Sequence, residues 1–137
     1  MNYRNTFIGT APDCPATEAT KPAARGTRRS VPLVQYELLE ANAYSYTQED
    51  VLWLTHVSHK GLHESQASPE HRRQFFAKGQ PCLRSSALAK RYGWGFHFDD
   101  DGHVALVASC SPEYAQHRTD KRLAQLDAMR NRRAGRD

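Results

Sequence analysis

Residues 78–95 hold the densest group of chemically capable side chains in the chain, KGQPCLRSSALAKRYGWG. Four cations, one cysteine, two serines, two large aromatic rings and three glycines fall within these eighteen positions. Cationic and hydroxyl donors are typical of an anion site, glycines let a ligand approach the backbone, and aromatic rings form a wall against a planar group. The sequence therefore predicts a pocket for a small anionic ligand, lined by Lys78, Gln80, Cys82, Arg84, Arg91, Tyr92 and Trp94.

Cys82 is the candidate nucleophile if this pocket is catalytic. Lys78 and Arg84 lie near it in the sequence, and nearby positive charge lowers the pKa of a thiol and raises its thiolate fraction. Most cysteine enzymes also need a general base, and His71 or His97 would have to fold over the stretch to supply one. The alternative is structural: the cysteine packs as a small residue, the glycines end helices and the cations are solvated. Whether a reaction is catalysed therefore stays open.

Two groups of histidines raise the question of a metal site. The first has helical spacing, but Gly61 is expected to break the helix before its last members. The second surrounds a turn whose Asp-Asp-Asp-Gly sequence is explained by turn preference alone. Neither has the ligand pattern of a closed site, so we predict no metal. The first group is His56, His59, His63 and Glu64, and the second is His97, Asp99, Asp100, Asp101 and His103.

The net charge of +4 supports a second hypothesis, a noncatalytic module that binds nucleic acid or protein. The basic segment 118–136 and Arg72-Arg73 would make its contacts, because clustered cations neutralise phosphates. Three helices before a hairpin follow the element order of a winged helix. However, the hairpin tip carries three aspartates at 99–101, which would repel phosphates. Nucleic acid is therefore the less favoured partner, and the oligomeric state is left undefined.

The elements that position these residues indicate an α+β fold, with several short helices around a small, mainly antiparallel sheet. A strand is predicted at 5–10, and Asp101-Gly102 is the turn of a hairpin over 95–109. Residues 11–30 combine three prolines with small residues and no large apolar group. That composition is typical of an extended or mobile arm.

Capping signals predict where the helices begin. Serine or threonine caps, prolines at the first helical position and acids in the first turn are typical of helix starts. A second Ser-Pro-Glu, at 111–113, predicts a turn through Tyr114. The predicted helices cover 31–42, 48–59, 69–78 and 120–134, and a buried strand is the alternative for 48–59.

The length and composition are those of one globular domain without membrane spans. A chain of 137 residues suits a single domain. The longest apolar runs, at 51–54 and 104–108, are far shorter than the ~20 residues of a membrane-spanning helix, so no membrane partner is expected. The N-terminus lacks the apolar region of a secretory signal. The three cysteines are an odd and sparse set, which favours a reducing, cytoplasmic location.

Four runs of the chain carry a wider resemblance: NTFIGTAPDCPAT, QYELLEANAYSYTQEDVL, KGQPCLRSSALAKRYGWGFHFDDDGHVAL and DAMRNRRA. Together they resemble a family of small soluble proteins known only as a domain of unknown function, and the similarity covers nearly the whole chain. The resemblance implies one domain over residues 1–137. The family has no assigned activity and no recorded cofactor, so the resemblance leaves both unknown and transfers no functional residue.

Overall fold

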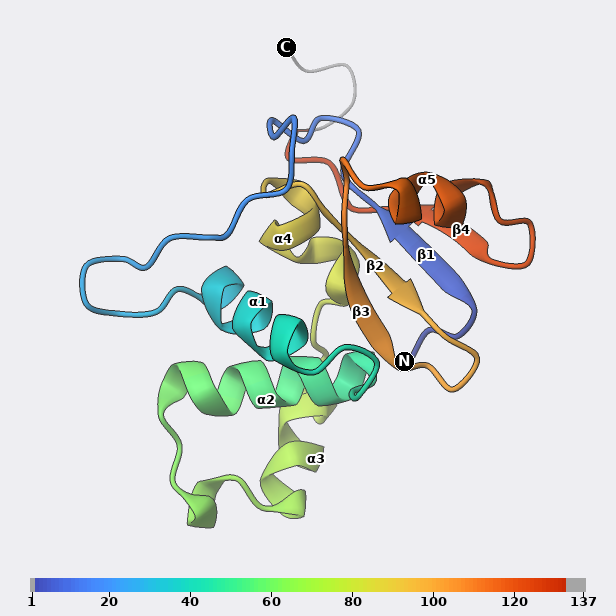
Figure 1. Ribbon diagram of the computed structural model, residues 1–137. Helices are drawn as coiled ribbons and strands as arrows, with labels where there is room; N and C mark the ends of the chain where they lie inside the picture. The colour runs from blue at the N-terminus through green and yellow to red at the C-terminus, as the bar shows by residue number, and fades with distance from the viewer. Residues whose placement is uncertain (1, 133–137) are drawn as a thin grey trace.

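The computed structural model describes residues 2–132 and contains one four-stranded sheet (Figure 1). The strands are β1 (Thr6–Gly9), β2 (Trp94–Phe98), β3 (Val104–Ala108) and β4 (Ala124–Asp127), in the order β3-β2-β1-β4. β2 pairs antiparallel with both β1 and β3, whereas β4 pairs parallel with β1. The predicted α+β fold, the first strand and the hairpin are confirmed, and the sheet is mixed.

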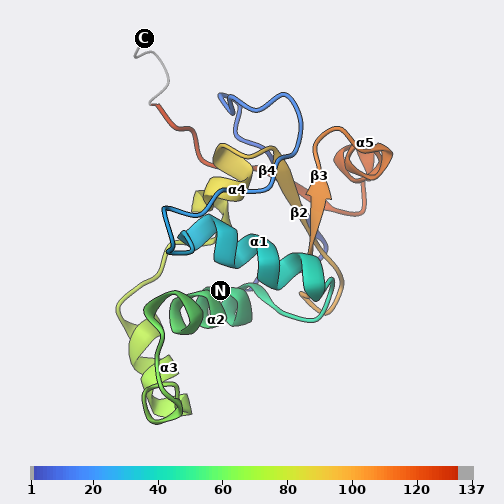
Figure 2. The same cartoon turned by 60° about the vertical axis from the view of Figure 1, so that its left-hand side comes forward.

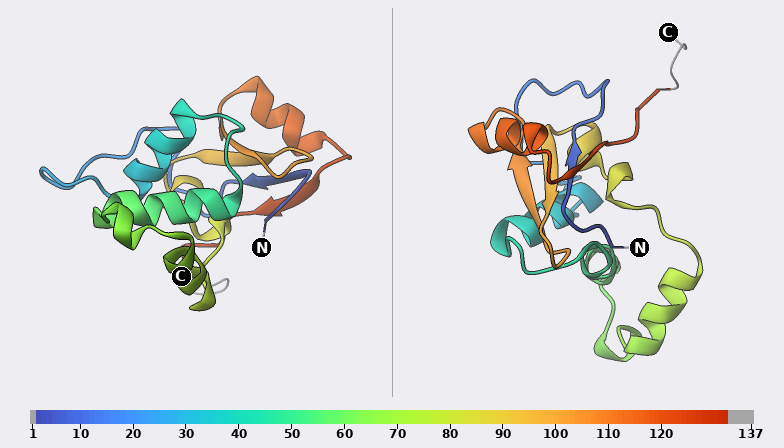
Figure 3. Two further views of the ribbon diagram at one scale, coloured as in Figure 1. Left: turned by 90° about the horizontal axis from the view of Figure 1, so that it is seen from below. Right: turned by 90° about the vertical axis from the view of Figure 1, so that its right-hand side faces the viewer.

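Strand register places the two faces of the sheet in different surroundings. Phe96 and Phe98 belong to the buried core with Leu39 of α1 (Val31–Ala41), Val51 of α2 (Gln48–Lys60) and Leu88 of α4 (Ala87–Lys90). The intervening side chain of β2 faces the other way, toward α5 (Pro112–Thr119), because side chains alternate along a strand. Figure 3 shows α5 on one side of the strands and α4 on the other.

The helices begin where the capping signals predict. Thr47 and Asp50 form a capping box at the start of α2, which ends at Gly61 in the left-handed conformation. Segment 48–60 is therefore a helix, and the buried-strand alternative is wrong. Ser68 caps α3 (Pro69–Ala77), and Ser111 caps α5, so the second Ser-Pro-Glu opens a helix where we predicted a turn. Two short 3-10 turns complete the fold, η1 (Glu64–Gln66) and η2 (Leu83–Ser85).

The predicted helix over 120–134 is wrong in the part that the structure describes. Residues 124–127 form β4, and its last predicted positions, 133 and 134, lie outside the described residues. The backbone N–H of Ala124 donates to the carbonyl of Asn5 at 2.8 Å, and that of Ala128 donates to Gly9 at 2.9 Å. The edge of β1 thus offers backbone partners that local helical spacing does not reveal, and tertiary pairing overrides the local preference.

The predicted arm over 11–30 is attached to the body of the fold as far as Pro22. Thr20 donates its backbone N–H to the carbonyl of Tyr92 at 2.9 Å and accepts the indole N–H of Trp94 at 2.8 Å. The side chain of Pro22 is fully buried. Beyond this anchor the chain projects away from the sheet and turns back into α1 (Figure 1).

Candidate functional site

The seven residues predicted to line one pocket are distributed over several places in the structure. Lys78 and Gln80 line a cavity between α2 and α3, which we call the α2–α3 cavity. Tyr92 lines a different cavity beneath the arm, the arm cavity, and Trp94 packs against Tyr36. The remaining three, Cys82, Arg84 and Arg91, are held by hydrogen bonds to other segments.

Cys82 is half-buried and accepts a hydrogen bond from the hydroxyl of Tyr3, with 3.4 Å between oxygen and sulfur. Burial, and then the contact with Cys82, raise the pKa of Tyr3 to about 12. The concavity beside the thiol is mainly apolar, and none of its lining residues described here is a histidine. His71 lines the α2–α3 cavity instead, and His97 stacks on His117. Within residues 2–132, neither histidine considered as a general base lines the concavity beside the thiol.

The two arginines of the stretch hold the C-terminal segment in place. The Nε of Arg84 donates to the carbonyl of Asp127 at 2.7 Å, and the Nε of Arg91 donates to Oδ1 of Asn131 at 3.2 Å. The carboxylate of Asp13 accepts the backbone N–H groups of Asn131 and Arg132, each at 3.0 Å. The hydrogen bond from Asn131 is the largest cause of a lowered pKa for Asp13. These contacts are structural.

The arm cavity has a volume of about 500 Å³ and lies where the arm turns back toward α1. Arg25 and Arg28 exchange two backbone hydrogen bonds, at 2.8 and 3.0 Å, across a two-residue turn with Gly26 at φ +60°. Residues directly opposite each other in such a pair project their side chains from the same face. The turn therefore directs the side chains of Arg25 and Arg28 from the same face, and both residues line the cavity.

The charge in the arm cavity is positive and only partly compensated. The Nε of Arg29 pairs with Oε1 of Glu37 at 2.8 Å. Within residues 2–132, no carboxylate pairs with Arg25 or Arg28. Burial, and then the charge of Arg28, lower the pKa of His59, which lines the same cavity. The ionic donors available to a ligand are thus guanidinium groups.

The N-terminal end of α1 adds few hydrogen-bond donors to the arm cavity. The hydroxyl of Ser30 is already engaged, donating to Ala23 at 3.0 Å and accepting the N–H of Leu33 at 3.4 Å. Pro32 has no N–H to offer. The side chain of Tyr92 contributes an aromatic surface instead.

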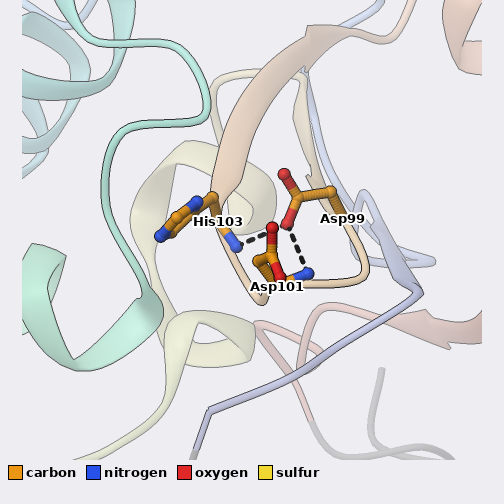
Figure 4. Close-up of side chains that lie close together, drawn as sticks. All are labelled: Asp99, Asp101 and His103. Atoms are coloured by element: carbon orange, nitrogen blue, oxygen red, sulfur yellow. Dashed lines mark hydrogen bonds between the residues drawn. The ribbon is translucent and has the colours of Figure 1, made fainter.

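The two histidine groups considered for metal binding do not behave alike. His56 packs against Phe75, with ring centroids 4.5 Å apart, whereas His59 lines the arm cavity. In the hairpin, Asp99, Asp101 and His103 offer ligand atoms within 4.8 Å of one another (Figure 4). However, Oδ1 of Asp99 accepts the backbone N–H groups of Asp101 and His103 at 3.0 and 2.8 Å. These hydrogen bonds account for the cluster as a hairpin turn.

Four of the arginines nominated for nucleic-acid contact are paired with carboxylates. Charge that an internal partner already neutralises contributes less to phosphate binding. Part of the basic segment, residues 133–136, lies outside the described residues. The ion pairs are Arg72–Asp50, Arg73–Glu70, Arg118–Asp127 and Arg122–Asp120.

Comparison with known proteins places the chain in a family. A family model described as a family of unknown function, DUF6157, matches residues 1–134. The chain belongs to this family. Neither a curated protein nor a solved structure matches the chain. Among the helices of residues 2–132, none has the length and apolar character needed to cross a membrane.

The sequence did not lead us to place Arg25, Arg28 or His59 in the predicted anion pocket, and His59 was considered only as a metal ligand. The arm was judged by its prolines and small residues, which predict a loop but say nothing of which side chains meet across it. The signal was nevertheless local. An arginine on each side of a Gly-containing dipeptide, Arg25-Gly26-Thr27-Arg28, is the pattern of a tight hairpin with two paired cations.

A stacked pair of histidines joins α5 to the sheet. The rings of His97 and His117 lie 4.0 Å apart at 16°, and Nδ1 of His97 is 2.7 Å from the hydroxyl of Tyr44. Burial, and then the charge of His117, lower the pKa of His97, while Asp99 and Asp120 oppose the shift. Two protonated rings at this separation would repel each other.

Acidification is therefore expected to destabilise the fold through this pair. Because the pKa of folded His97 lies below that of an unfolded imidazole, the unfolded chain binds more protons in mild acid. The stabilisation is complete above about pH 6.5 and decreases as the pH falls toward the lower folded value. We expect Tm to fall between pH 7.5 and 5.5, and to fall less in His97→Phe. An equal fall in His97→Phe and in the control His63→Gln would contradict this prediction.

Proposed function

We propose that this protein binds a small anionic ligand in the arm cavity, between the side chains of Arg25 and Arg28. The turn at Gly26 pairs the backbones of these two arginines directly opposite each other. Like charges in that position destabilise a paired strand. A bound anion would convert the repulsion into two charge-assisted interactions, and this paired arrangement is the observation that supports the proposal.

The chemistry of the cavity favours an oxyanion. Guanidinium groups present planar forks of N–H donors that match carboxylate and phosphate oxygens. The apolar sides of Val31 and Pro32 and the ring of Tyr92 would contact the remainder of the ligand. A volume of about 500 Å³ lies within the range of small-molecule sites.

The proposed ligand is still a small anion, as residues 78–95 predicted, but its binding site is the arm cavity instead of a pocket formed by that stretch. Tyr92 is the member of the seven that lines the arm cavity. The cations come from the arm and not from the stretch. We centre the site on Arg25 and Arg28 because both line a cavity. Arg84 and Arg91 instead donate hydrogen bonds to the C-terminal segment.

Inorganic phosphate provides the test, with binding measured by isothermal titration calorimetry at low ionic strength. Truncating either arginine is expected to weaken binding roughly 10-fold or more, because a hydrogen bond to a charged group is worth about 1.5–3 kcal/mol. The variants are Arg25→Ala and Arg28→Ala. Arg73→Ala is the matched control, because it removes an exposed arginine from α3, outside the cavity.

Two results would overturn the proposal. One is the absence of phosphate binding to the wild-type protein at millimolar concentration. The other is equal binding by all three arginine variants, which would place the phosphate elsewhere. A conservative Arg28→Lys variant is expected to bind with intermediate affinity, since it keeps the charge and loses the fork.

A further inference from the structure

The α2–α3 cavity is a second concave site, separate in its lining from the arm cavity. It has a volume of about 390 Å³ and lies among α2, the connection after it, and α3. Helix α3 has no fully buried residue. In Figures 1 and 2 it lies beyond α2, at the end of the molecule away from the sheet.

Aromatic rings form one wall of this cavity. The ring centroid of Phe75 lies 5.5 Å from that of Trp53 and 4.5 Å from that of His56. Trp53 is only 6% exposed, so it backs the wall, while Phe75 is half-buried and lines the cavity. Burial, followed by the charges of Lys60 and Lys78, lowers the pKa of His56. A neutral imidazole therefore extends the aromatic surface.

Polar residues of several kinds line the same cavity. Lys78 caps the C-terminal end of α3 and makes no ion pair within residues 2–132. Nδ1 of His71 is 2.6 Å from the hydroxyl of Ser68, which fixes that side of its ring and leaves Nε2 for other partners. The amide of Gln74 also lines the cavity. One ammonium, one imidazole and an amide thus border a ring-lined wall.

We propose that the α2–α3 cavity binds a planar aromatic ring that carries a carboxylate. The ring would pack on Phe75 and His56, since aromatic pairs gain stability from offset and tilted contacts beyond the area they bury. The carboxylate would pair with Lys78. A single ammonium matches a singly charged group, whereas the two forks of the arm cavity suit an oxyanion with more acceptor atoms. Lys78 and Gln80 of the 78–95 stretch both line this site.

4-Fluorobenzoate is the probe, observed through its fluorine resonance on titration with the protein. Lys78→Met keeps the length of the side chain and removes its charge, and we expect it to weaken binding roughly 10-fold. Phe75→Leu removes the ring and is expected to weaken binding of both 4-fluorobenzoate and the uncharged 4-fluorobenzamide. Lys121→Met, an exposed lysine outside the cavity, is the control.

The tryptophans provide a second readout. The chain contains two of them, so Trp94→Phe leaves Trp53 as the only indole. Addition of 4-fluorobenzoate is expected to change the Trp53 fluorescence in this variant. Absence of binding to the wild-type protein, or undiminished binding by Lys78→Met, would overturn the proposal. Loss of binding in Arg28→Ala would also overturn it, because the ring acid would then occupy the arm cavity. Failure to bind phosphate would leave this site unaffected.

Discussion

The Gly93→Ala variant is expected to lose about 3 kcal/mol of folding free energy, from a left-handed backbone and an overpacked contact. Gly93 has φ +80°, a conformation that a side chain makes costly. A Cβ at this position would lie 2.8 Å from the carbonyl oxygen of Glu18 in the arm. That neighbour is backbone, so it cannot rotate away. Thermal unfolding should show Tm lowered by roughly 10 °C, given the usual entropy of unfolding for a chain of this size.

A matched variant separates the two causes. Gly61 has φ +64° but no atom within 4 Å of a Cβ built on it. Gly61→Ala should therefore cost only the conformational penalty, about 1 kcal/mol. The difference between the variants measures the contact between Gly93 and the arm. Equal losses of stability would show that the arm does not press on this residue.

The same contact links the body of the fold to the arm cavity. Residues 92–94 hold the arm through Thr20, and the paired arginines follow only a few residues later. Displacing the arm at Glu18 should therefore weaken phosphate binding as well as stability. Gly61→Ala should leave phosphate binding unchanged. Gly93 would thus act on the candidate site without lining it.

Local signals located most of the elements, because they need only neighbouring residues. A serine followed by proline and an acid starts a helix through bonds that reach three or four positions along the chain. The failure at 120–134 has a different origin. Strand β4 forms because it pairs with β1, more than a hundred residues away in the sequence. The residues of 120–134 alone do not indicate that β1 lies beside them in the fold.

The candidate site was harder to predict, for a geometric reason. The 78–95 stretch changes direction several times. It leaves the end of α3, passes through η2 and α4, and enters β2. Proximity in sequence then does not imply a shared pocket: Lys78 and Tyr92 line different cavities. Arg25 and Arg28, by contrast, are separated by one two-residue turn, and residues this close in sequence remain close in the fold.

Gln48 is a buried polar residue, and its substitution is expected to give the largest loss of stability after that of Gly93→Ala. It begins α2, has no exposed surface, and its Oε1 accepts the backbone N–H of Leu83 at 2.9 Å. Gln48→Met keeps the volume and removes the acceptor, so the buried N–H loses this partner. Such a loss costs about 1–3 kcal/mol. We expect Tm to fall by roughly 5–8 °C, whereas the exposed control Gln116→Met should change Tm little.

The hydrogen bond from Leu83 also predicts where the damage appears. Leu83 begins η2 directly after Cys82, so loss of its acceptor should loosen the segment that holds the thiol. Alkylation of Cys82, followed by mass spectrometry of its peptide, should be faster in Gln48→Met than in the wild type. The rate at exposed Cys110 should not change. If both cysteines accelerate equally, the variant opens the whole fold, and Gln48 does not act through the turn at Leu83.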